Sequence, residues 1–178
     1  MVIFTIDNRY FHVEHRLSAK WLPLEECFRT PLIIGTPTLH PEHKGTTNDN
    51  FTLSIDWVPT VLSAAGLNAP ELMQGRDILG FYRNKFNNWR TEFLYEIPYL
   101  LEPQSWPTVS GLIRKDFKYI DYASAQLFDM KEDSKEANDS IGAPVHVARI
   151  AEMKKCFGEL QSTAMIPESH TAALSRPR

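Results

Sequence analysis

The amino-acid sequence predicts an α/β fold with a mixed N-terminal part and a small antiparallel sheet with a helix behind it. Residues 2–6 form an apolar run that ends at the polar pair Asp7-Asn8. Residues 54–65 repeat apolar side chains at helical spacing, and residues 92–122 contain strand-like stretches separated by turn residues. Strands mixed with helices are typical of α/β sheets, whereas consecutive short strands are typical of antiparallel ones. At 178 residues and 43% hydrophobic content, the chain can bury a sizeable core.

The first fifty residues are predicted to contain two strands, a short helix and a long loop. Residues 2–6 read VIFTI, a continuous apolar run that favours a buried strand of a parallel sheet. Residues 22–28 favour a short helix, and residues 31–34 favour a second strand that Gly35 closes. Residues 36–50 are rich in Thr, Pro, His and Asn, which is typical of a loop.

Residues 54–65 are predicted to form the main helix of the first half. Ser54 or Asp56 can cap its start, Pro59 falls in the tolerated first turn, and Gly66 ends it. The spacing i, i+3, i+4, i+7 predicts one apolar stripe that faces the core. Its members are Val58, Val61, Leu62 and Ala65.

The second half is predicted to be antiparallel. Residues 92–96 favour a strand, and residues 108–114 and 117–122 favour a hairpin around Lys115-Asp116. Residues 131–138 form a charged loop, and Pro144 is suited to opening a helix. The apolar positions of that helix keep 3–4 spacing and are Ile150, Met153, Phe157 and Leu160. We therefore expect a boundary near residue 90, with residues 1–90 and 91–166 as two parts and residues 167–178 as a loose tail.

Composition and charge exclude several classes of partner. The net charge of −3 and the pI of about 6.1 provide no basic surface for nucleic acid or an anionic membrane. No apolar run approaches the roughly 20 residues of a membrane span. Cys27 and Cys156 have no metal-binding spacing, so two unrelated thiols are favoured over a disulfide. No secretory leader follows Met1, and the immediate start of a core strand suggests a fragment of a larger protein.

Three groups of polar residues are candidates for chemistry. Asp7 and Asn8 follow a predicted strand and offer hard oxygen ligands for Ca²⁺ or Mg²⁺, although both are also common turn residues. Lys20 suits an anionic substrate near a cation, or is an ordinary surface lysine. A third group suits zinc or acid–base work, but no fourth ligand with recognisable spacing accompanies it. It consists of His12, Glu14 and His15.

The ordered set of motifs resembles the C-terminal part of type I sulfatases of the alkaline phosphatase superfamily. The stretch VIFTIDNRYFHVEHRLSAKWLPLEECFRTPLII is similar to the family's strand, Asp-Asn-Gly, Gly-Glu-His-Gly and Lys segments. SIDWVPTVLSAAGL resembles its Asp-x-x-Pro-Thr helix, and MQGRDIL its Gln-Gly-Arg segment. NNWRTEFLYE, GLIRKDFKYIDY and QLFDMKEDSKEAND resemble later segments in the same order. The match spans roughly residues 1 to 168 and is most similar to N-acetylglucosamine-6-sulfatase-like enzymes.

The resemblance implies a fold and a set of site residues. The fold would be the end of the central mixed sheet with helices, plus a small antiparallel sheet packed on a C-terminal helix. Asp7 and Asn8 match a pair of calcium ligands, and Lys20 matches the lysine that contacts the sulfate ester. His15 matches a residue that supports the site without being the catalytic acid. A periplasmic, lysosomal or extracellular location is implied for the full-length enzyme.

Several positions depart from the family pattern. Arg9, Val13 and Arg16 stand where the family has glycine, which serves where backbone needs a positive φ or a close approach to a ligand. Two added guanidinium groups would repel calcium or contact a sulfated sugar. Neither Cys27 nor Cys156 lies in the Cys-x-Pro-x-Arg motif that yields the formylglycine nucleophile.

The expected function is therefore that of a C-terminal portion of a sulfuric ester hydrolase, inactive by itself. Its substrates would be sulfated amino sugars or glycosaminoglycans. The alternative is a non-catalytic sulfatase remnant that binds sulfated glycans or a partner protein, for which Arg9 and Arg16 are the motivating residues. A phosphohydrolase of the same superfamily is a weaker third interpretation. The sequence indicates no oligomeric state.

Overall fold

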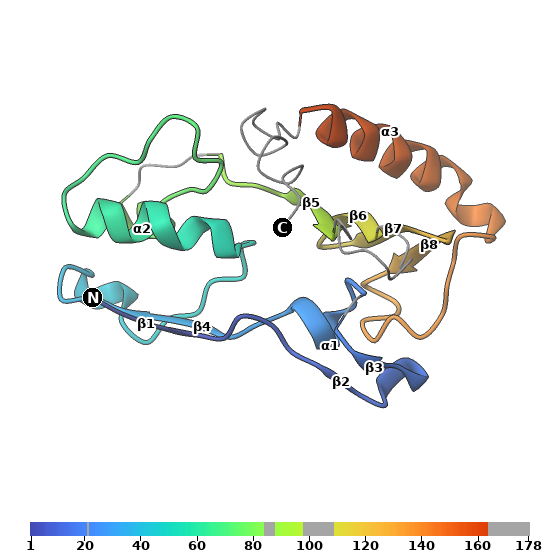
Figure 1. Ribbon diagram of the computed structural model, residues 1–178, viewed down its shortest axis with the longest axis horizontal. Helices are drawn as coiled ribbons and strands as arrows, with labels where there is room; N and C mark the ends of the chain where they lie inside the picture. The colour runs from blue at the N-terminus through green and yellow to red at the C-terminus, as the bar shows by residue number, and fades with distance from the viewer. Residues whose placement is uncertain (21, 84–87, 98–108, 164–178) are drawn as a thin grey trace, which may run out of the picture. The chain divides into compact units, whose positions relative to one another are not determined.

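The computed structural model describes residues 1–20, 22–83, 88–97 and 109–163. The chain divides into two compact units, Met1–Thr91 and Glu92–Arg178, and each is described by itself (Figure 1). The predicted loose tail, residues 167–178, lies outside the described residues, as does Thr108 at the predicted start of the hairpin. No helix within the described ranges is long and apolar enough to cross a membrane.

The first strand forms, but it is not the buried parallel strand that we predicted. Strand β1 (Val2–Thr5) pairs antiparallel with β4 (Leu32–Gly35), and Thr5 lies opposite Leu32. Val2 is 71% exposed and Phe4 is 58% exposed. The two strands make a two-stranded ribbon, which has no second layer of its own to cover both faces. The apolar run therefore specified a strand correctly but did not specify its burial.

A second ribbon and several short helices complete the first unit. Strand β2 (Phe11–His12) pairs antiparallel with β3 (Ser18–Ala19). The short helix predicted within residues 22–28 is α1 (Glu25–Phe28). The remaining elements are the 3-10 turns Glu14–Arg16, Pro41–His43, Ser54–Asp56 and Ile78–Arg83 and the helix α2 (Trp57–Ala64).

Helix α2 confirms the predicted position and corrects the predicted core face. Gly66 adopts φ +76° and its N–H donates to the carbonyl of Ser63, so this glycine ends the helix as expected. Val58 and Val61 of the predicted stripe are 52% and 48% exposed, whereas Pro59 and Thr60 are buried. The buried face is set by hydrogen bonds of Thr60, which a hydrophobic pattern does not reveal.

The second unit is a four-stranded antiparallel sheet in the order β5-β6-β7-β8. The strands are β5 (Glu92–Ile97), β6 (Val109–Arg114), β7 (Phe117–Tyr122) and β8 (Ser124–Asp129). The hairpin around Lys115-Asp116 forms as predicted, and β8 is an additional strand that joins β7 through a turn at Ala123. Sequential pairing of this kind buries one face under a single covering helix.

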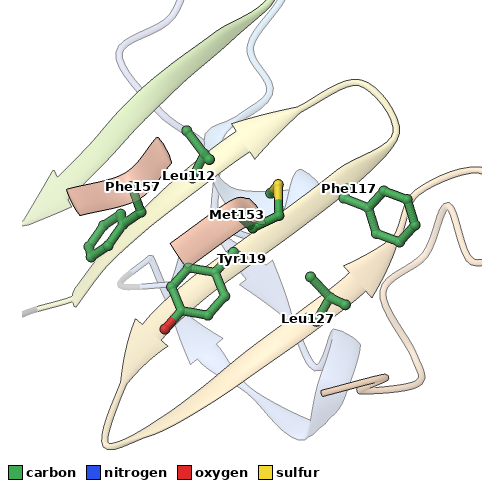
Figure 2. Packing of buried hydrophobic residues seen from close by; sticks show 6 residues of the cluster. All are labelled: Leu112, Phe117, Tyr119, Leu127, Met153 and Phe157. Carbon is green, nitrogen blue, oxygen red and sulfur yellow. The ribbon is translucent and has the colours of Figure 1, made fainter. Parts of the chain in front are cut away.

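The covering helix is α3 (Val147–Thr163), which follows a 3-10 turn opened by Pro144. Met153 and Phe157 pack against sheet residues of one face, as Figure 2 shows. The sheet residues of this cluster are Leu112, Phe117, Tyr119 and Leu127. Ile150 and Leu160 pack around its edge, so the predicted apolar stripe of this helix is its core face.

A buried ion pair ties the charged loop to the sheet. Lys118 lies in β7 among fully buried side chains, and its ammonium group pairs with the carboxylate of Glu136. Both side chains have no exposed surface. Glu136 adopts φ 53°, so the loop makes a tight turn at the point of contact. The predicted charged loop is thus anchored to the sheet, because a buried charge needs a partner.

Candidate functional site at the end of strand β1

The candidate metal ligands lie side by side after β1. The side-chain amide of Asn8 donates a hydrogen bond of 2.7 Å to Oδ2 of Asp7. Oδ1 of Asp7 and the side-chain carbonyl oxygen of Asn8 take no part in this hydrogen bond. Asp7 is exposed and Asn8 is half-buried. The pair can therefore contribute oxygen ligands to a hard cation without rearrangement of buried groups.

A backbone hydrogen bond holds this pair against helix α1. The N–H group of Arg9 donates to the carbonyl of Cys27 over 2.9 Å. Cys27 is only 3% exposed, and burial raises the pKa of its thiol. The segment after Asn8 is thereby fixed to a buried part of the unit, and Cys27 serves packing rather than chemistry. Cys27 and Cys156 are both free thiols, as predicted.

The β2–β3 ribbon brings Lys20 back to the start of the same segment. Phe11 pairs with Ala19, and His12 pairs with Ser18. Continuation of this antiparallel register places Tyr10 opposite Lys20, two residues after Asn8. The ammonium nitrogen of Lys20 lies 5.4 Å from the centroid of the Tyr10 ring. Lys20 thus lies beside Tyr10, a residue of the segment that follows Asp7-Asn8.

His15 faces helix α1 rather than open solvent. Its Nε2 lies 3.3 Å from Oε2 of Glu26, and the two side chains are only 18% and 25% exposed. Its ring also meets Phe11 edge-on, with centroids 6.0 Å apart. These contacts fix the tip of the β2–β3 ribbon against α1.

The ribbon tip keeps a backbone conformation that normally requires glycine. Val13 has φ 84°, His15 has φ 55° and Arg16 has φ 59°. Left-handed backbone is unfavourable for a β-branched residue such as Val13 and costs of order 1–3 kcal/mol per residue. Val13 and Arg16 are two of the three positions where the family pattern has glycine, and the third is Arg9. The substitutions therefore changed the side chains but preserved the turn.

The Glu14 carboxylate accepts hydrogen bonds from the backbone of this turn. The backbone N–H groups of Glu14 and His12 donate to its carboxylate and hold its pKa below the usual range. A carboxylate engaged in this way is a poor zinc ligand. Among the described residues, no three His, Cys, Asp or Glu side chains gather as a metal-holding group. The zinc alternative for His12, Glu14 and His15 therefore gains no support, and Asp7 with Asn8 supplies only part of the six to eight ligands that calcium takes.

A second polar centre, around Asp56, was not predicted. The Asp56 side chain is fully buried and binds both terminal nitrogens of Arg90, one of them at 2.7 Å. It also accepts 2.8 Å hydrogen bonds from the backbone N–H groups of Leu53 and Arg76. A Cβ atom on Gly75 would lie 1.9 Å from the Ile55 carbonyl oxygen, so only glycine fits there.

The Asp56 centre is closed by Thr60 and by an aromatic cover. The Thr60 hydroxyl donates to the Asp56 carbonyl over 2.6 Å and accepts from the N–H of Ile78 over 2.9 Å. The Trp89 indole donates to the Phe51 carbonyl and lies against the guanidinium of Arg90. The Asp-x-x-Pro-Thr, Gln-Gly-Arg and Trp-Arg segments thus meet through hydrogen bonds at the buried Asp56 side chain. Their wide separation in sequence hid this role.

Comparison with known proteins identifies the family of the chain. Residues 13–163 match the family described as N-sulphoglucosamine sulphohydrolase, C-terminal. The chain belongs to the sulfatase family. More specifically, it is a C-terminal sulfatase region, as the motifs predicted, and its fold is that of the corresponding part of alkaline-phosphatase-like enzymes.

Relatives of this sulfatase region are much longer than the chain. It is 28% identical over 168 residues to N-acetylglucosamine-6-O-sulfatase of Bacteroides thetaiotaomicron, covering 90% of the chain and 30% of the relative. It is 30% identical over 164 residues to the multifunctional alkaline phosphatase superfamily protein PehA of Trinickia caryophylli. This match covers 84% of the chain and 32% of the relative. The sulfatase region therefore spans about a third of the length of these curated relatives.

Solved structures share the fold of this sulfatase region. One, solved with its substrate D-glucosamine-2-N,6-O-disulfate, matches with a TM-score of 0.79 at 28% identity, over 90% of the chain and 33% of that structure. The phosphonate monoester hydrolase of Agrobacterium radiobacter matches with a TM-score of 0.80 at 20% identity. This match covers 92% of the chain and 35% of that structure. The second match establishes the fold alone.

Proposed function

We propose that this chain is the part of a sulfuric ester hydrolase that binds the sulfate group of a sulfated amino sugar. The observation that supports the proposal is the antiparallel pairing of β2 with β3 together with the contact of Lys20 with the Tyr10 ring, which brings Lys20 to the segment that follows Asp7-Asn8. A relative named for N-acetylglucosamine 6-O-sulfate chemistry and a similar structure that holds a glucosamine disulfate support the substrate class. Glycosaminoglycan-type sugars carry the same group.

Each residue of the proposed site has a distinct task. Lys20 contributes an ammonium group that pairs with sulfate oxygens and stabilises the negative charge that develops on the leaving oxygen. Asp7 and Asn8 would supply two oxygen ligands to calcium (Ca²⁺), which when bound withdraws charge from the sulfate. His15 holds the ribbon tip through Glu26 and keeps Lys20 in register. Remaining calcium ligands would have to come from outside the described residues.

We expect that this chain does not supply the nucleophile of the reaction. Sulfatases use a formylglycine made from Cys in a Cys-x-Pro-x-Arg motif, and neither Cys27 nor Cys156 lies in one. Cys27 is also buried. We therefore expect the chain to bind sulfated sugars without hydrolysing them. Turnover of a sulfate ester by the purified chain would contradict this expectation.

The test is a binding titration of the purified chain with D-glucosamine 6-sulfate in calcium-containing buffer. Loss of a charge-assisted contact in Lys20→Ala should weaken binding roughly 10-fold to 100-fold. Lys131→Ala removes an exposed lysine of the second unit and should leave the affinity unchanged. Unsulfated glucosamine is the matched ligand control. Equal affinities of the Lys20 and Lys131 variants would refute the assignment of Lys20.

A second candidate function is the binding of sulfated glycans without any part in catalysis. Arg9 and Arg16 are exposed, and within the described ranges neither guanidinium group forms an ion pair. Exposed guanidinium groups suit a polymer with repeated sulfates. If Arg9→Gly and Arg16→Gly abolish binding to a sulfated polysaccharide while D-glucosamine 6-sulfate still binds, the glycan-binding role is favoured. If both variants bind the polysaccharide normally, the arginines have no such role.

A further inference from the structure

We propose that Tyr10 is a positioning residue for Lys20, holding the ammonium group in place through the face of its ring. The proposal rests on the sulfate-binding role of Lys20 stated above and adds a residue that the motifs do not mark. Tyr10 lies between the Asp7-Asn8 pair and strand β2. Its assignment comes from geometry alone.

The first step of the argument is the register of the ribbon. Phe11 lies opposite Ala19 and His12 lies opposite Ser18, so the next pair outward is Tyr10 and Lys20. Side chains of directly opposed residues on one face lie about 4.5–5.5 Å apart at Cβ. The adjacent backbone pairs thus bring the two residues near each other, and the ammonium nitrogen of Lys20 lies 5.4 Å from the ring centroid.

The second step is the chemistry of the contact. The face of an aromatic ring is electron-rich and attracts a cation within about 6 Å of the centroid. Lys20 is half-buried, while Tyr10 is 51% exposed. The ring therefore restrains a flexible four-carbon side chain without neutralising its charge. A carboxylate partner would compete with sulfate for the ammonium group, whereas an aromatic face leaves its three N–H donors free to bind an anion.

The third step is the support behind the ribbon. The Arg9 N–H group binds the carbonyl of the buried Cys27, one residue before Tyr10. At the other end, His15 contacts Glu26 of the same helix α1. Both ends of the segment that carries the Tyr10 ring are thus attached to one helix. Loss of the Tyr10 ring should therefore free the lysine but leave the ribbon in place.

The experiment compares Tyr10→Leu with Tyr10→Phe by NMR of the full chain. The ring current of Tyr10 should shift the ε-methylene resonance of Lys20 upfield. Tyr10→Leu should abolish this shift and weaken D-glucosamine 6-sulfate binding about 2-fold to 5-fold. Tyr10→Phe keeps the ring face and should retain both. Tyr122→Leu, which removes a tyrosine from the second unit, is the control and should change neither.

The outcomes separate this proposal from the proposed function. An unchanged Lys20 resonance in Tyr10→Leu, with backbone amide shifts near those of the wild type, overturns the role of Tyr10. A lost shift with no sulfate binding by the wild-type chain refutes the proposed function while the Tyr10–Lys20 contact stands. A Tyr10→Phe variant that behaves like Tyr10→Leu would show that the hydroxyl matters and would also overturn positioning by the ring face.

Discussion

The two units are of similar length but are stabilised in different ways. The second unit closes a conventional core, in which Leu112, Leu127 and Met153 have no exposed surface. The first unit is organised around a fully buried carboxylate, Asp56, with Arg90 as its partner. Most of the large exposed apolar side chains in the described ranges belong to the first unit, including Val2 and Phe4 of strand β1.

The two kinds of core place different demands on the sequence. A hydrophobic core tolerates many side chains of similar volume and needs no particular sequence motif. A buried polar centre needs every donor and acceptor in place, because an unpaired buried charge is costly. In the first unit the Asp-x-x-Pro-Thr, Gln-Gly-Arg and Trp-Arg motifs meet at this polar centre, and the candidate site occupies a separate ribbon. Motif recognition alone does not distinguish the two roles.

The largest expected effect is loss of the Asp56 centre. Asp56→Ala should leave the guanidinium of Arg90 and two backbone N–H groups without their acceptor, and should destabilise the first unit by about 3–5 kcal/mol. Chemical denaturation followed by amide NMR would detect this loss separately in each unit. Asp49→Ala, at an exposed loop carboxylate, should have little effect. Native-like resonances throughout the first unit of Asp56→Ala would contradict the assigned role.

The next effect tests the core of the second unit. Met153→Ala should create a cavity between helix α3 and the sheet and cost about 2–5 kcal/mol. The measurement is the free energy of unfolding from a urea titration. Val147→Ala on the same helix changes a side chain that is 65% exposed and should stay within about 0.5 kcal/mol of wild type. Equal losses for the two variants would exclude the proposed packing of α3.

A smaller, opposite effect is expected at the ribbon tip. Val13→Gly and Arg16→Gly should each relieve a left-handed residue, offset in part by the greater freedom of glycine when unfolded, for a net gain of about 1 kcal/mol. Thermal unfolding would show the gain. Val145→Gly, at an exposed residue without a positive φ, should instead lose stability. A loss in the Val13 and Arg16 variants as well would mean that their backbone is not strained.

The smallest effect concerns pH. A hydrogen bond from Arg114, followed by the charges of Arg149 and Arg114, holds the pKa of Glu152 below its unfolded value of 4.5. Because the folded pKa is the lower one, this stabilisation is present above about pH 4.5 and is lost as pH falls through the folded pKa.

Glu152→Gln should therefore flatten the fall of the melting temperature between about pH 5 and pH 3. Gln161→Ala, at an exposed uncharged residue of the same helix, should keep the wild-type pH profile. A Glu152→Gln profile that is superimposable on the wild type would show that the Arg114 contact does not contribute.

The sequence by itself determined several elements and their relative order, because these depend on local patterns. The strand at residues 2–6, the end of α2 at Gly66, the hairpin at Lys115-Asp116 and the core face of α3 all follow from periodicity and turn chemistry. The family was also readable, since its motifs occur in order. These features need no knowledge of which distant residues meet.

Tertiary structure alone decided what covers each element and which side chains meet. It exposed Val58 and buried Thr60, since the hydrogen-bond partners of Thr60 come from Asp56 and from Ile78. It joined Asp56 to Arg90 across 34 positions. It also set Tyr10 against Lys20 through strand register, which depends on backbone pairing between segments. Long-range hydrogen bonds and register have no local signal, so only the folded chain reveals them.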